Sequence, residues 1–161
     1  MPTMQKVSTC LWFDSEAETA ARFYVSLFEN SRITMISRYG KWDPKREGAV
    51  LAVTFELDGS QFMALNGGPQ FPHTEASSMV VNCDSQAEID RLWSALTADG
   101  GKEVQCGWLK DRFGLSWQII YAGQLDMLTE TDQAKADRVM AAVMGMVKTD
   151  VAKLEAAARG E

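Results

Sequence analysis

The side chains that could do chemistry are concentrated in one stretch, which runs from Cys106 to Ile120 and reads CGWLKDRFGLSWQII. Its charged middle is closed by Gly114, a pattern typical of a turn. We expect Asp111 and Arg112 there to hold the turn or to pair at a subunit contact. The residues that follow, Ser116–Tyr121, combine aromatic and β-branched side chains, which predicts a buried β-strand.

Gln118 is the candidate ligand-binding residue of this strand. Side chains alternate along a strand, so Gln118 shares a face with Ser116 and Ile120, while Trp117 and Ile119 share the other. On a concave, covered face the amide could hydrogen-bond a ligand. On a solvated face it would be an ordinary surface glutamine, and the strand alone favours neither reading.

Other reactive side chains are few. The three cysteines, Cys10, Cys83 and Cys106, are odd in number and far apart, which favours a reducing cytoplasm over a disulfide framework. Zinc would need more closely spaced ligands, and His73 is the single histidine. Cys106 is either a reactive thiol or an inert buried one, and the second is the commoner case.

Composition limits the class of protein. A chain of 161 residues suits one domain, or two small modules that share a core. The net charge is −6 and the basic residues are scattered, whereas a nucleic-acid surface needs a basic stripe. No apolar run approaches the roughly 20 residues that span a membrane, and the first residues resemble no secretion signal. We therefore expect a cytoplasmic protein without nucleic-acid or membrane partners.

The chain repeats its own pattern. A β-rich run, Val7–Phe13, leads into FDSEAE, and a second, Ser77–Cys83, leads into CDSQAE, 70 positions later. In each copy a serine and a glutamate three residues apart predict a capping box, so helices should begin at Ser15 and Ser85. Further strands follow each helix, so an internal duplication of a βαβββ-like unit is predicted. Chance similarity between two ordinary helix caps is the alternative.

Beyond Ala122 the pattern becomes helical, with helices expected over Ala134–Val147 and Asp150–Arg159. Several methionines fall in the first of these helices. Such Met-rich faces are more often core or subunit-contact surface than ligand-binding boxes. We expect contact surface from Met140, Met144 and Met146.

Five segments carry a family resemblance: TCLWFD, FYVSLFENSRI, ALNGGPQF, EASSMVVNCDSQAEIDRLW and CGWLKDRFGLSWQI. With them the chain resembles the PhnB-like proteins, or demethylubiquinone methyltransferase-like domain. These belong to the glyoxalase, bleomycin-resistance and extradiol dioxygenase superfamily, also called vicinal oxygen chelate. The resemblance implies an α+β fold whose two βαβββ modules form a curved, mostly antiparallel sheet around a cavity, usually in a homodimer. The family domain would span residues 1–123, with modules at about 5–68 and 76–122, followed by a helical extension over 124–161.

The superfamily's metal site does not carry over to this chain. The resemblance places its four ligand positions at Val7, at Ala64 or Asn66, at Ser78 and at Gln118, where no carboxylate or imidazole stands. We expect no metal and no other cofactor. The segment Gly67-Gly68-Pro69 follows a predicted hairpin strand, so it is a poor match to a methyltransferase's glycine-rich loop.

Two functions stay open. One is a metal-free protein that binds a small molecule. The other is an enzyme acting on a small aromatic, quinone-like or carbonyl substrate through hydrogen-bonding groups, Asp111 among them. The missing acid–base pair favours the first slightly. The candidate ligand-binding residues are Gln118, Ser78, Asn66, Trp12, Trp117 and Cys106.

Overall fold

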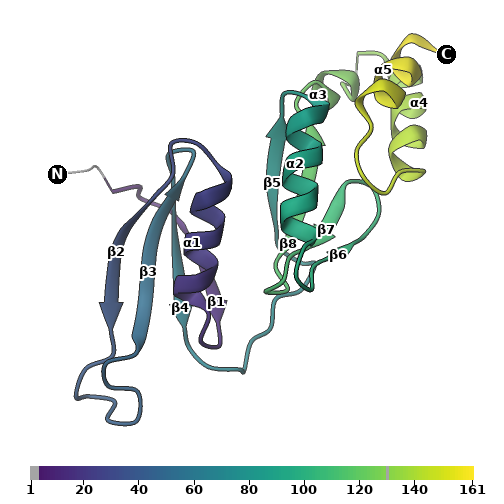
Figure 1. Ribbon diagram of the computed structural model, residues 1–161. Coiled ribbons are helices and arrows are strands. Elements are labelled where there is room, and N and C mark those ends of the chain that lie inside the picture. Colours follow the sequence, from purple (N-terminus) through teal and green to yellow (C-terminus); the bar gives the residue numbers. More distant parts are fainter. Residues whose placement is uncertain (1–3, 130) are drawn as a thin grey trace. The chain divides into compact units, whose positions relative to one another are not determined.

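The computed structural model describes residues 4–129 and 131–161 (Figure 1). The chain divides into two compact units, the first ending at Pro72 and the second beginning at His73. Each unit has its own four-stranded sheet, and the fold is α+β.

The first unit carries one helix and four strands. Its sheet has the order β1-β4-β3-β2, with β1 and β4 parallel and the other pairs antiparallel. Leu11, Ala64 and Val53 stand side by side across three strands and are buried, and α1 packs against β3 and β4. The elements are β1 (Thr9–Phe13), α1 (Ala17–Leu27), β2 (Arg32–Arg38), β3 (Val50–Leu57) and β4 (Ser60–Asn66).

The second unit repeats this topology. Its sheet has the order β5-β8-β7-β6, again with a parallel pair, β5 and β8, and antiparallel pairs beyond it. The predicted duplication of a β-α-β-β-β unit is therefore confirmed. The elements are β5 (Ser78–Cys83), α2 (Gln86–Thr97), β6 (Lys102–Glu103), β7 (Trp108–Lys110) and β8 (Ser116–Tyr121).

The two helices begin differently, although their sequences match. Ser85 caps α2, because its side chain accepts the backbone N–H of Glu88 at 3.2 Å, as predicted. The corresponding prediction for Ser15 is wrong: α1 begins at Ala17, and no side chain of its N-cap residue takes a helix amide. The buried side chain of Asn66 instead accepts the Ala17 N–H at 2.9 Å.

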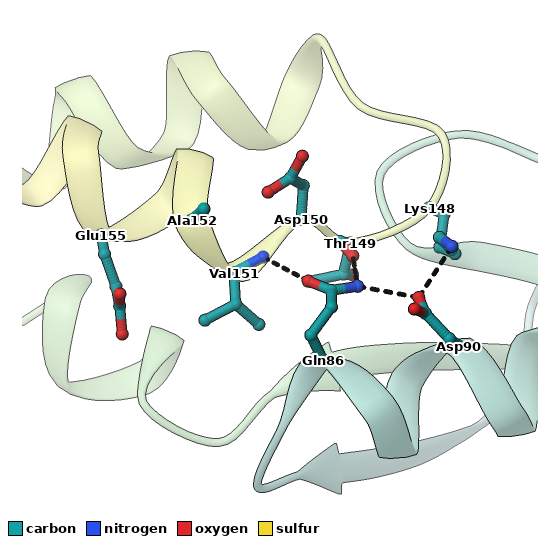
Figure 2. A pocket seen from close by; sticks show the side chains of 8 residues that line it. All are labelled: Gln86, Asp90, Lys148, Thr149, Asp150, Val151, Ala152 and Glu155. Atoms are coloured by element: carbon teal, nitrogen blue, oxygen red, sulfur yellow. Dashed lines mark hydrogen bonds and ion pairs between the residues drawn. The ribbon is translucent and has the colours of Figure 1, made fainter.

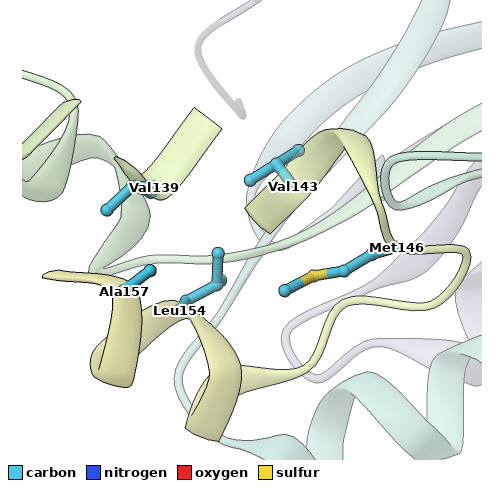
Figure 3. Packing of buried hydrophobic residues seen from close by; sticks show 5 residues of the cluster. All are labelled: Val139, Val143, Met146, Leu154 and Ala157. Carbon is cyan, nitrogen blue, oxygen red and sulfur yellow. The ribbon is translucent and has the colours of Figure 1, made fainter. Parts of the chain in front are cut away.

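The C-terminal segment forms three helices: α3 (Gln124–Met127), α4 (Gln133–Met144) and α5 (Val151–Arg159). Figure 3 shows the apolar cluster between α4 and α5, which contains Val139, Val143, Met146, Leu154 and Ala157. The expectation that Met146 offers contact surface is wrong, because α4 ends before it and the chain turns it into this cluster. Met140 and Met144 are exposed, at 41% and 63%.

The caps can be compared directly by mutation. Ser85→Ala should lower the free energy of unfolding by about 1 kcal/mol, because it removes the acceptor of an orphan helix amide. Ser15→Ala, at the matching position of the first module, should change it by less than about 0.5 kcal/mol. Urea unfolding followed by circular dichroism measures both. Equal losses for the two variants would contradict the difference in capping.

Candidate functional site

The two faces of β8 differ in burial. Leu109, Trp117 and Ile119 are fully buried, Leu109 and Trp117 stand opposite each other, and α2 packs against β7 and β8. This is the helix-covered face. Gln118 points the other way and is half-buried, and its neighbour Val80 is 50% exposed.

Gln118 and Ser78 meet on this second face. The Gln118 amide Nε2 donates to Ser78 Oγ at 2.9 Å, across 40 positions of sequence. Ser78 stands beside Ser116 in the parallel pair, and Trp108 stands beside Gln118 in the antiparallel one. We call this surface the Gln118 face; its residues are Ser78, Val80, Trp108, Lys110, Ser116, Gln118 and Ile120.

A buried carboxylate sets the turn that leads into β8. Asp111 is 2% exposed, and its Oδ1 accepts the backbone N–H groups of Phe113 at 2.8 Å and Leu115 at 3.1 Å. Its Oδ2 accepts the indole N–H of Trp117 at 2.9 Å. Asp111 therefore holds the turn, one of the two predicted roles, and Trp117 lies on the helix-covered face with its polar atom engaged.

The C-terminal segment is bound to the same strands. The N–H groups of Cys106 and Gly107 donate to the carbonyls of Met146 at 2.8 Å and Val147 at 2.9 Å, and Thr149 Oγ1 donates to the Ile119 carbonyl at 2.6 Å. A Cβ at Gly107 would lie 2.8 Å from Thr149 Oγ1, so only glycine fits. We call these contacts the tail clasp. They place Cys106 at a turn, with its Sγ 3.7 Å from the sulfur of Met144.

Two of the predicted ligand-binding residues belong to the first unit. The Asn66 side chain accepts the Ala17 N–H and donates to the Val50 carbonyl at 3.1 Å, so both ends of its amide are used inside the module. The indole N–H of Trp12 donates to the Gly68 carbonyl at 2.8 Å. Strand β4 pairs with β1 and β3, so Asn66 is not on a strand paired with β5 or β8.

A cleft of about 550 Å³ lies elsewhere in the second unit, between α2 and the start of α5 (Figure 2). Gln86 bridges it: its Nε2 donates to Asp90 at 2.9 Å and to the Thr149 carbonyl at 3.0 Å, and its Oε1 accepts the Val151 N–H at 2.8 Å. Lys148 pairs with Asp90 at 2.7 Å, and with the Gln86 amide it holds the pKa of Asp90 below its usual range. The polar groups that line the cleft bond to one another, so the cleft is a contact region between α2 and the C-terminal segment.

The side chains at the superfamily's four ligand positions do not fit a metal ion. Val7 is exposed and aliphatic, and the Asn66 amide is already used by Ala17 and Val50. Ser78 and Gln118 offer a hydroxyl and an amide, which are weak ligands without a carboxylate or imidazole. Within the residues that the structure describes, no group of three or more His, Cys, Asp or Glu could hold a metal ion.

The glycine pair after β4 has a packing role. A Cβ at Gly67 would lie 2.1 Å from the Trp12 ring, and Gly68 has φ +108°. Both glycines are required by local geometry, and the segment leads into a loop before β5 rather than a helix. It therefore does not have the form of a glycine-rich cofactor loop, which opens a helix after a strand.

Residues 5–120 match the family model described as 3-demethylubiquinone-9 3-methyltransferase. The chain belongs to this family. The PhnB protein from Bacillus cereus is 38% identical, with a TM-score of 0.67, over 73% of this chain and 100% of that one. The predicted PhnB-like resemblance is thereby confirmed. No curated protein matches the chain.

More distant structures share the fold of this family member. Protein PA1353 from Pseudomonas aeruginosa is 21% identical, with a TM-score of 0.59, over 72% of this chain and 96% of that one. A mutant fosfomycin resistance protein from Listeria monocytogenes, complexed with Mn(II) and 1S,2S-dihydroxypropylphosphonic acid, is 14% identical, with a TM-score of 0.50, over 75% and 93%. At these identities the two likenesses show a shared fold. Within residues 4–129 and 131–161, no helix has the length and apolar character that crossing a membrane requires.

The role of Asp111 can be tested by removing one acceptor. Asp111→Asn should lower the free energy of unfolding by about 2–4 kcal/mol, because its NH₂ group would face an N–H donor in a buried turn. Asp99→Asn is the control, since that carboxylate is 76% exposed and a change there should cost less than about 0.5 kcal/mol. Chemical denaturation measures both. A loss as small as the control's would show that the carboxylate does not hold the turn.

Proposed function

We propose that this family member binds a small molecule on the Gln118 face without a metal ion. The observation that carries the proposal is the Gln118–Ser78 hydrogen bond on the sheet face opposite the one that carries Trp117 and Ile119. Sites for small molecules combine mostly apolar walls with a few placed polar groups. Val80 and Ile120 supply apolar surface here, and Trp108 supplies an aromatic ring.

The chemistry of the face defines the ligand class. A glutamine amide can donate two hydrogen bonds and accept at its oxygen, and Gln118 uses one donor on Ser78. The rest of the amide can pair with a carbonyl or hydroxyl of a ligand whose body packs on Trp108. We therefore propose a small aromatic, quinone-like or carbonyl compound. Cys106 remains a proposed ligand contact of this unit, and the buried Trp117 would act by holding β8 in place. The predictions for Asn66 and Trp12, which belong to the first unit, stay outside this proposed site.

Catalysis on such a compound is the second candidate. It is favoured by the ion pair between Lys110 and Glu75, which places titratable groups at the edge of the same face. The hydrogen bond and charge of Lys110 hold the pKa of Glu75 below its usual range. Binding without catalysis is the better supported function, because Lys110 and Glu75 already neutralise each other as an ion pair.

Replacing Gln118 tests the binding site. Gln118→Leu keeps the size of the side chain, so the fold should persist. The affinity for benzamide, an aromatic ligand with a carbonyl and an amide, should fall by about 1–3 kcal/mol, because its polar group loses a partner. Quenching of tryptophan fluorescence by benzamide measures the affinity. The same substitution at the exposed Gln105 is the control. If wild type does not bind benzamide, or both variants bind it as wild type does, the proposed site is wrong.

We also propose that the protein is a cytoplasmic homodimer. Burial raises the pKa of the Cys83 thiol to about 12, and all three cysteines are free, as expected of a reduced protein. Exposed methionines on the first sheet and on α4 offer contact surface, namely Met35, Met63, Met140 and Met144.

Light scattering tests the dimer. A dilute solution should give about twice the chain mass of 17.8 kDa. Met144→Glu should shift the mass toward the monomer, because it places a charge in the contact. Val7→Glu, at another exposed apolar position, before β1, should leave the mass unchanged. A monomeric wild-type protein would contradict the proposal.

A further inference from the structure

One polar group of the Gln118 face has no partner. The hydroxyl of Ser116 is buried, with the residue 1% exposed, and in the part of the chain that the structure describes its Oγ makes no hydrogen bond. A buried hydroxyl without a partner costs free energy, so such groups in folded proteins call for an explanation. Thr149, the other buried hydroxyl near β8, does donate to the Ile119 carbonyl.

A lysine neighbours this hydroxyl on the same face. Lys110 on β7 and Ser78 on β5 stand on either side of Ser116 in the register, so all three side chains point to one face. The Lys110 ammonium pairs with the carboxylate of Glu75, which lies three residues before Ser78. An ammonium donor and an unpaired hydroxyl donor therefore belong to neighbouring positions of one sheet face.

We propose that Lys110 and Ser116 form a subsite for an oxyanion of the ligand, such as a carboxylate, and that Glu75 pairs with the Lys110 ammonium until the ligand binds. This subsite deepens the proposed function and rests on it. The ligand's oxyanion replaces the Glu75 carboxylate on the Lys110 ammonium and accepts a hydrogen bond from Ser116 Oγ. Its aromatic or apolar body then extends toward Gln118 and Trp108.

The two partners of the ion pair differ in how firmly they are held. Lys110 is part of β7, pairs with Ser116 in the sheet, and its side chain is 33% exposed. Glu75 precedes β5 outside any strand, and its side chain is 58% exposed. Ion pairs with an exposed partner contribute little to stability, so Glu75 can give up its place at small cost. The Lys110 ammonium is therefore the part of the ion pair that stays in place, and the Glu75 carboxylate is the part that a ligand can replace.

The test compares benzoate with benzamide, which have the same shape but differ in charge. Binding is measured by quenching of tryptophan fluorescence at constant ionic strength. Wild type should bind benzoate more tightly than benzamide. Glu75→Gln should raise the benzoate affinity by about 3- to 10-fold, because it removes the competing carboxylate. Lys110→Met should lower it by about 10-fold or more, and Ser116→Ala by about 5-fold. Benzamide carries no charge, so its affinity should change less than that of benzoate in the Glu75 and Lys110 variants.

Two further measurements separate binding from folding. Ser116→Ala should not lower Tm, because the hydroxyl has no partner to lose, whereas Thr149→Val should lower it. Lys148→Met breaks the ion pair with Asp90 in the same unit and should leave benzoate binding unchanged. The gain in affinity of Glu75→Gln cannot result from misfolding.

Failure of the subsite and failure of the binding site give different results. If benzamide binds and depends on Gln118, but benzoate is not preferred or Glu75→Gln does not tighten it, the oxyanion subsite is wrong and the proposed function stands. If neither probe binds to wild type at millimolar concentrations, both are wrong. A drop in Tm for Ser116→Ala equal to that for Thr149→Val would also overturn the subsite.

Discussion

The Asp111 carboxylate is the contact on which the proposed site depends most. Its two buried oxygens accept hydrogen bonds from two backbone amides of its own turn and from the indole of Trp117. With Trp117 held on the helix-covered face, alternation along β8 turns Ser116 and Gln118 to the opposite face. A shift of one residue in this turn would exchange the two faces, burying the Gln118 amide and exposing the indole. The residues that would contact a ligand are therefore positioned by one that lies on the other side of the sheet.

The C-terminal segment is hydrogen-bonded to β8 and to the turn before β7. Gly107 accepts the Ile119 N–H at its carbonyl and donates its own N–H to Val147, and Thr149 completes the connection to Ile119. The segment predicted as an extension of the family domain therefore contributes hydrogen bonds to the second sheet. Because Ile119 follows Gln118 directly, the tail clasp and the Asp111 turn hold β8 on both sides of the candidate site.

The two modules share a topology but use their polar residues differently. In the first, Asn66 at the end of β4 caps α1, and Trp12 on β1 packs against the glycine pair. In the second, α2 is capped by its own Ser85, so β8 does not have to supply a cap. The two modules therefore satisfy the first helix amides with different residues. This difference explains why the same Asp-Ser-x-Ala-Glu pattern predicts one helix start correctly and the other incorrectly.

The sequence by itself determined the features that depend on local periodicity. Alternation predicted the strand around Gln118 and the division of its two faces, and the repeated pattern predicted the two modules and the Ser85 cap. Tertiary structure decided which distant residues meet: the Ser78–Gln118 contact, the Asn66 cap and the Lys110–Glu75 ion pair. It also buried Met146, which was expected to offer contact surface. Alternation is a property of one strand, whereas these contacts depend on the register between strands that are far apart in sequence, and hydrophobic pattern alone does not specify that register.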